Sequence, residues 1–81
     1  MPPLTSGFTI MGEVAAGSVN GTNTIFKTFV SYAPGSLVVM LNGHLKRPDF
    51  EDGWIELGGK LFQMKLAPEL GDVVQVAYRP Q

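Results

Sequence analysis

The chain has 81 residues, of which 44% are hydrophobic and 16% charged, and its formal net charge is −1. A chain of this size buries only about 60% of its extended surface, so we expect one domain with a narrow stability margin. Because it contains no cysteine, disulfide staples and thiolate metal sites are excluded. The near-neutral charge argues against nucleic acid as a partner.

The amino terminus lacks the features of an export signal. Residues 1–7 contain no basic group and no apolar run, and no stretch of about 20 apolar residues occurs anywhere in the chain, so the sequence predicts no membrane partner. We expect residues 1–17 to form an amino-terminal arm with short strands at 8–11 and 13–15, interrupted by Gly12. Residues 18–81 are expected to form the folded domain.

Ten glycines and six prolines interrupt the chain at short intervals and leave little room for helices. The longest uninterrupted window is 22–33, where Ile25, Phe26, Phe29 and Val30 fit a helical stripe as well as a strand. The β-branched and aromatic residues of this window favour a strand.

Turn signals divide the rest of the chain into strands. Pro34-Gly35 is typical of a type II turn, and Asn42-Gly43 of the type I′ turn of a tight hairpin, so we expect strands at 36–41 and 44–47, the second ended by Pro48. Gly58-Gly59 predicts a second hairpin, between strands at 54–57 and 60–66. A last strand is expected at 72–79.

Five to seven short strands with regularly spaced turns predict an all-β fold, a small antiparallel β-sandwich or partly open barrel. Strand alternation assigns a set of apolar residues to the core. They are Leu37, Val39, Leu41, Ile55, Leu57, Phe62, Met64, Leu66, Val74, Val76 and Tyr78.

The opposite strand faces are also partly apolar. Val38 and Met40 alternate with inward residues on one strand, and Val73 and Ala77 do so on the last strand. These residues either lie under a loop or the amino-terminal segment, or form an interface between chains. We favour the interface, with Trp54 as an aromatic anchor, and predict a homo-oligomer.

The sequence contains no combination of side chains that is typical of a catalytic or metal site. His44 is the single histidine, so no histidine-based metal cluster or activated nucleophile can be assembled within one chain. The carboxylates of residues 49–53 lack the ligand spacing of an EF-hand, so we interpret this segment as a solvated loop. We therefore predict no catalytic residue, no metal, no cofactor and no enzymatic activity.

Four segments together resemble a small β-domain that recurs in structural proteins of tailed bacteriophages. They are NGTNTIF at 20–26, PGSLVVMLNG at 34–43, DF at 49–50 and APELGDVVQVAYR at 67–79. The resemblance spans about residues 18–79. It departs from the commonest form at FQMK, 62–65, where threonine-rich segments are usual, and at EDGW, 51–54, which is longer and more apolar.

The resemblance implies a non-catalytic sandwich that assembles through sheet faces or edges, commonly as a trimer, and it carries over no catalytic residue. Because the chain starts at Met1 and ends just past the last strand, we expect a complete small protein, which favours a capsid decoration or cement protein. It would bind the outer capsid of the virion, after assembly in the host cytoplasm, with its amino-terminal arm reaching a neighbour.

Two alternatives remain open at this point. One is a tail fibre or head-tail adaptor subunit, which would occupy a single vertex or ring. The other, from a different class, is a carbohydrate-binding β-module that uses Trp54, Tyr32 or Tyr78 as a sugar platform.

Overall fold

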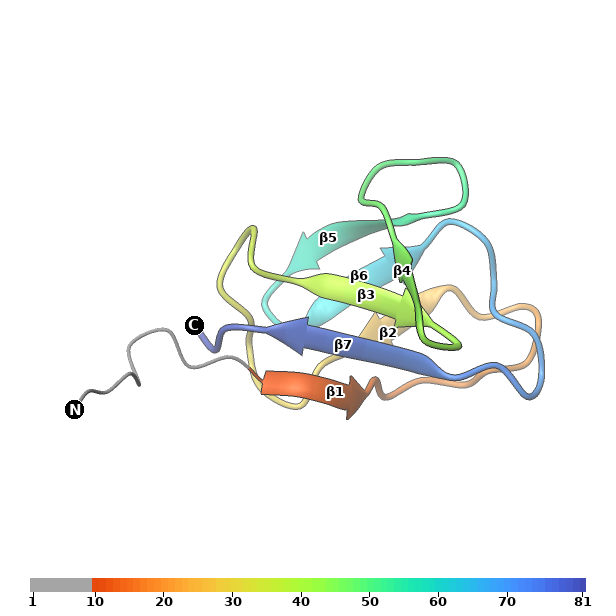
Figure 1. The fold of residues 1–81 in the computed structure, drawn as a ribbon, viewed down its shortest axis with the longest axis horizontal. Coiled ribbons are helices and arrows are strands. Elements are labelled where there is room, and N and C mark those ends of the chain that lie inside the picture. Colours follow the sequence, from red (N-terminus) through yellow and green to blue (C-terminus); the bar gives the residue numbers. More distant parts are fainter. Residues whose placement is uncertain (1–9) are drawn as a thin grey trace.

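The computed structural model describes residues 10–81, and these form seven strands in two antiparallel sheets (Figure 1). The four-stranded sheet has the order β1-β7-β3-β4, and the three-stranded sheet behind it has the order β2-β6-β5. The strands are β1 (Ile10–Val14), β2 (Ile25–Lys27), β3 (Val38–Leu41), β4 (His44–Lys46), β5 (Trp54–Gly58), β6 (Leu61–Met64) and β7 (Val74–Tyr78). The predicted all-β antiparallel sandwich is confirmed.

The turns predicted from glycine, proline and asparagine form where expected. Ser36 N–H donates to the Ala33 carbonyl at 3.0 Å, and Gly35 has a φ of 81°, as a type II turn requires,. Asn42 and Gly43 both have positive φ, 53° and 83°, which matches the type I′ turn that joins β3 to β4,.

The central strands of the four-stranded sheet follow the predicted alternation. Leu37 and Val39 are buried from the β3 side, and Val74, Val76 and Tyr78 are buried from β7. Leu41, also predicted to be inside, is partly buried and packs against this cluster. These side chains form one layer of the core.

Strand β5 has the opposite orientation to the predicted one. Trp54 pairs with buried Met64, and Glu56 with buried Phe62, so Trp54 and Glu56 take the inner face and the predicted core residues Ile55 and Leu57 do not. Burying an indole removes more apolar surface from water than burying either aliphatic side chain. That gain favours the strand orientation with Trp54 inside, although the same orientation also turns the carboxylate of Glu56 inward.

One further expectation about the three-stranded sheet is wrong, and another is confirmed over only part of its range. Strand β6 ends at Met64, so the alternation does not reach Leu66, which is 62% exposed. In the window 22–33 only Ile25–Lys27 forms a strand, and Tyr32 makes a single bridge to Pro80. Phe26 and Tyr32 are nevertheless buried core residues that the alternation argument omitted.

Residues 10–17 contribute to the sandwich. Strand β1 pairs with β7, and Ala15 is part of the core cluster. The described parts of the predicted strands 8–11 and 13–15 fall on one strand, β1, which contains an irregularity between Ile10 and Glu13 where Gly12 has a φ of 75°. Residues 1–9 of the predicted arm lie outside the described residues.

Candidate interaction surfaces

One row of side chains crosses all four strands of the larger sheet on the side away from the core. The pairing register aligns Val14 with Gln75, Gln75 with Met40, and Met40 with Leu45. Val14 and Leu45, at the two ends of this row, are 65% and 68% exposed. Val38 and Ala77 pair in the adjacent row. These six residues are called the outer face below.

The outer face carries no charged side chain. Its one polar residue, Gln75, donates from Nε2 to the Gly12 carbonyl at 3.1 Å, so its amide is already engaged within the chain. Among residues 10–81 no strand or helix forms a second layer over this row of mostly aliphatic side chains, and such a surface is suited to a protein partner.

Most of the predicted interface residues come together here. Val38, Met40 and Ala77 belong to the outer face, and exposed Val73 precedes β7 with the same alternation as Gln75. Ala77 is buried by its neighbours and adds little contact area.

Trp54 has to be removed from the predicted interface. Its side chain is 3% exposed, belongs to the core, and donates from Nε1 to the Lys46 carbonyl at 3.1 Å. The prediction failed because it assumed that Trp54 faced outward on β5. Sequence reasoning missed Val14 and Leu45, although the alternation of their short strands could have indicated them.

The first seam between the two sheets, between β1 and β2, is closed by hydrogen bonds. Ala16 N–H donates to the Lys27 carbonyl at 2.8 Å, and Lys27 N–H returns a bond to Ala16 at 2.9 Å. The carboxylate of Glu13 accepts from the Tyr78 hydroxyl at 2.6 Å and from Phe29 N–H at 2.7 Å. Each oxygen of this carboxylate therefore has a donor within the chain.

The Glu13 contact also affects the ionisation of Tyr78. Burial, and then the hydrogen bond to Glu13, raise the pKa of the Tyr78 hydroxyl above its ordinary value of 10.0. A buried phenol that stays protonated and is held by a carboxylate serves as a structural clamp.

An apolar groove of about 540 Å³ lies beside this clamp. Its lining is Ile10, Glu13, Val14, Ala16, Lys27 and Phe29. Phe29 is 81% exposed, and Val14 belongs to both the groove and the outer face, so the two apolar surfaces are continuous around β1.

The second seam, between β4 and β5, is held by a backbone bridge and a hydrogen bond. Pro48 forms a parallel bridge with Trp54, and Asp49 N–H donates to the Trp54 carbonyl at 2.8 Å. The chain passes so close here that a Cβ on Gly53 would lie 1.7 Å from the Arg47 carbonyl oxygen, so only glycine fits at that position. The bridges at both seams cover part of the free strand edges.

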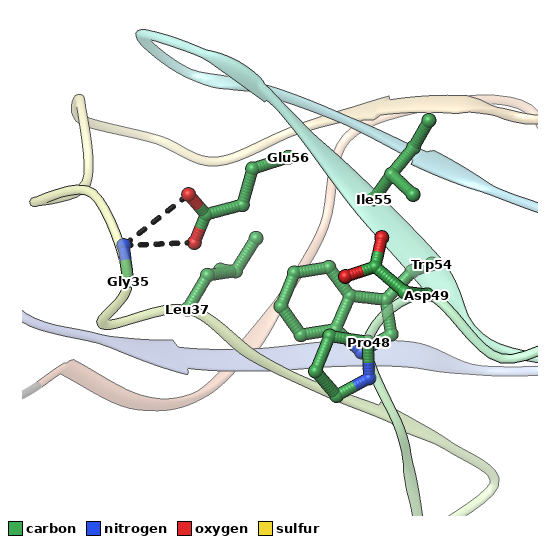
Figure 2. Close-up of a pocket in the computed structure, with 7 residues that line it drawn as sticks. All are labelled: Gly35, Leu37, Pro48, Asp49, Trp54, Ile55 and Glu56. Carbon is green, nitrogen blue, oxygen red and sulfur yellow. Dashed lines mark hydrogen bonds between the residues drawn. The ribbon is translucent and has the colours of Figure 1, made fainter.

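A pocket of about 400 Å³ opens at this second seam (Figure 2). It is lined by Gly35, Leu37, Pro48, Asp49, Trp54, Ile55 and Glu56. Both oxygens of the Glu56 carboxylate accept from Gly35 N–H, at 3.0 and 3.2 Å. In Figure 2 the Glu56 carboxylate lies on the Gly35 side and Asp49 on the Pro48 side. Sequence reasoning did not identify this pocket.

The described residues offer little for other chemistry. Within residues 10–81 there is no group of three potential metal-ligating side chains, and no helix there has the length and apolar character to span a membrane. The three rings proposed as a sugar platform, Trp54, Tyr32 and Tyr78, are at most 3% exposed. Their faces are covered by the core, so the surface needed for carbohydrate stacking is not presented by these residues.

Comparisons with known proteins add no family: no family model, no curated protein and no solved structure matches this chain.

Proposed function

We propose that this chain is a non-enzymatic structural subunit of a tailed-bacteriophage particle, a capsid decoration protein that acts as a homotrimer on the virion. The observation that carries the proposal is the uncharged, aliphatic outer face of the four-stranded sheet. The resemblance of four sequence segments to the phage β-domain indicates the kind of particle, and the outer face offers a means of attachment.

Attachment through a sheet face fits the strand edges better than addition of another strand. Strands β2 and β4 have three residues each, and the seam bridges at Lys27 and Trp54 occupy part of the edges of β2 and β5. Short and covered edges resist pairing with another chain. The proposed partners therefore contact side chains of the outer face.

The outer face alone is smaller than a stable interface between two chains, so a trimer must also bury the groove beside it. Four strands spaced about 5 Å apart and three to five residues long give roughly 250–300 Å² in projection. A stable isolated pair buries about 800 Å² on each partner. Continuity with the groove at Phe29 enlarges the contact within a trimer, and a repeating shell multiplies it by binding many copies at once.

The particle that contains this protein provides the direct test. Particles reconstituted with the chain are expected to survive heat and osmotic shock better than particles reconstituted without it, and copies should cover the shell. Unchanged resistance would contradict the proposal. A ring of copies at one vertex would instead identify a tail or head-tail adaptor subunit.

Self-association can be tested on the purified protein by sedimentation velocity at micromolar concentration. The unaltered chain is expected to sediment as a trimer, and Leu45→Glu should yield monomers because it places a charge on the outer face. Leu70→Glu is the matched control, since Leu70 is 87% exposed but lies in the loop before β7. A monomeric unaltered chain, or equal effects of both substitutions, would contradict the trimer.

A further inference from the structure

The pocket at the second seam combines apolar walls with two carboxylates. Leu37 and Pro48 contribute aliphatic surface, and Trp54 forms part of the wall near Pro48 (Figure 2). Asp49 and Glu56 are the only charged residues among the seven that line it. The pocket therefore has mostly apolar walls and two negatively charged carboxylates.

In the described part of the chain, neither carboxylate of the pocket takes part in an ion pair. Among residues 10–81 the one ion pair joins Lys46 to Asp52, with 3.7 Å between Nζ and Oδ2. Arg47, the nearest other base in the sequence, has its guanidinium 4.9 Å from the centre of the Phe50 ring. Glu56 is bonded only to the Gly35 amide, and no hydrogen bond to the Asp49 carboxylate occurs in the described part of the chain. The negative charge of the pocket is left uncompensated.

We propose that this pocket accepts an arginine side chain of a protein partner. The volume of about 400 Å³ is sufficient for such a side chain. Its methylene stem would pack on Leu37 and Pro48, while the carboxylates of Asp49 and Glu56 attract the guanidinium from the two sides of the pocket. Arginine fits better than lysine because a planar guanidinium, weakly hydrated and with five donors, can pack on ring and aliphatic walls while it bonds to a carboxylate.

The proposal is independent of the outer face. The outer face lies on the four-stranded sheet, whereas the pocket lies between the sheets at β5, so the two surfaces can bind different groups. A single arginine probe tests the pocket in the isolated protein, without any particle and without self-association. Failure of this test would leave the capsid proposal standing, and the reverse also holds.

The experiment is a titration of the ¹⁵N-labelled protein with N-acetyl-arginine amide, followed by NMR. The chain has one tryptophan, so the indole N–H signal of Trp54 reports on the pocket without ambiguity. We expect saturable shifts at that signal and at the Gly35 amide, with a dissociation constant of about 1–10 mM, as is reasonable for one side chain in a small pocket. N-acetyl-lysine amide should bind at least about twofold more weakly.

N-acetyl-citrulline amide supplies the matched control on the ligand side, because it retains the shape of arginine and lacks its charge. It is expected to cause no saturable shift at Trp54 or Gly35. Equal binding of citrulline and arginine would overturn the proposal, and so would shifts spread evenly over the acidic surface. This control needs no variant, so it remains decisive even if a substitution disturbs folding.

Substitutions supply the matched control on the protein side. Glu56→Gln keeps an oxygen that can accept from Gly35, and Asp49→Asn suits the φ of 67° at that position, because asparagine tolerates left-handed backbone,. Each should weaken arginine binding at least about threefold. Glu51→Gln removes the same charge from the same loop, outside the pocket lining, and should change binding less than about twofold. An effect of Glu51→Gln as large as that of Asp49→Asn would overturn the proposal.

Discussion

The two seams of the sandwich use acidic side chains in different ways. At the β1–β2 seam the Glu13 carboxylate accepts from both the Tyr78 hydroxyl and the Phe29 amide. At the β4–β5 seam, Glu56 shares one backbone amide between its two oxygens, and a pocket remains open. The Glu13 carboxylate has two separate donors that help to hold the fold together, whereas the Glu56 carboxylate has one and retains more acceptor capacity.

Trp54→Ala should have the largest effect on stability. Trp54 is buried at the open seam and bonds to Lys46, so its truncation is expected to cost about 3–5 kcal/mol. A domain of this size has about 4–12 kcal/mol to lose. Urea unfolding followed by circular dichroism measures the change. Phe50→Ala, at a half-exposed ring of the same loop, should cost less than about 1 kcal/mol, and equal losses would show that the seam does not depend on the indole.

Glu13→Gln and Glu56→Gln compare the two seams with the same chemical change. An amide has one acceptor oxygen, so Glu13→Gln deprives either Tyr78 or Phe29 of its partner and should cost about 1–2 kcal/mol. Glu56→Gln preserves the bond from Gly35 and should stay within about 0.5 kcal/mol of the unaltered protein. The denaturant concentrations at the unfolding midpoints of the two variants measure these changes. A larger loss of stability in Glu56→Gln than in Glu13→Gln would contradict the assigned roles of the two carboxylates.

Alkaline pH should destabilise the fold through two buried tyrosines. Burial raises the pKa of both Tyr32 and Tyr78 above the ordinary value of 10.0, so the folded chain favours the neutral phenols. Their contribution is complete below pH 10 and is lost as pH rises through the folded pKa values. The urea concentration at the midpoint of unfolding, measured between pH 8 and 12, should stay constant up to about pH 10 and then fall. Tyr78→Phe should reduce that fall, and an unchanged pH profile in this variant would remove Tyr78 as a cause.

A smaller acid-side effect is expected at the loop that precedes β7. The amide of Asn42 and the Glu69 backbone N–H lower the pKa of the Asp72 carboxyl below 3.8. This stabilising contribution is present above pH 3.8 and is lost as pH falls through the lower, folded value. An NMR titration of Asp72 should show the lowered pKa, and Asn42→Ala should return that pKa toward 3.8. No change in that variant would contradict the assigned cause.

Local signals predicted the parts of the fold that depend on local chemistry. Asn42-Gly43 and Pro34-Gly35 form their turns because the required φ values restrict which residues can occupy them. The alternation of β3 and β7 was predictable, since their aliphatic residues leave one consistent inner face. Part of the outer face was also predicted, namely Val38, Met40 and Ala77, together with the neighbouring Val73.

The orientation of β5 could not be derived from its own pattern. Ile55 and Leu57 satisfy the alternation rule as well as any inner pair, and the choice of Trp54 depends on the partner strand β6 and on a bond to Lys46. The pocket was unpredictable for the same reason, because it is built from residues 35–37, 48–49 and 54–56. Such contacts belong to the tertiary structure and have no signature in a short window.

Gly12 has a consequence for the two side chains that follow it. The irregularity in β1 shifts the register by one residue, which turns Glu13 toward Tyr78 and Val14 toward solvent,. A regular strand continued from Ile10 with the same residues would point the two side chains the other way, leaving the phenol without its acceptor and an acid at the end of the aliphatic row. The extra residue at Gly12 therefore determines which of the two side chains meets the phenol and which one meets solvent.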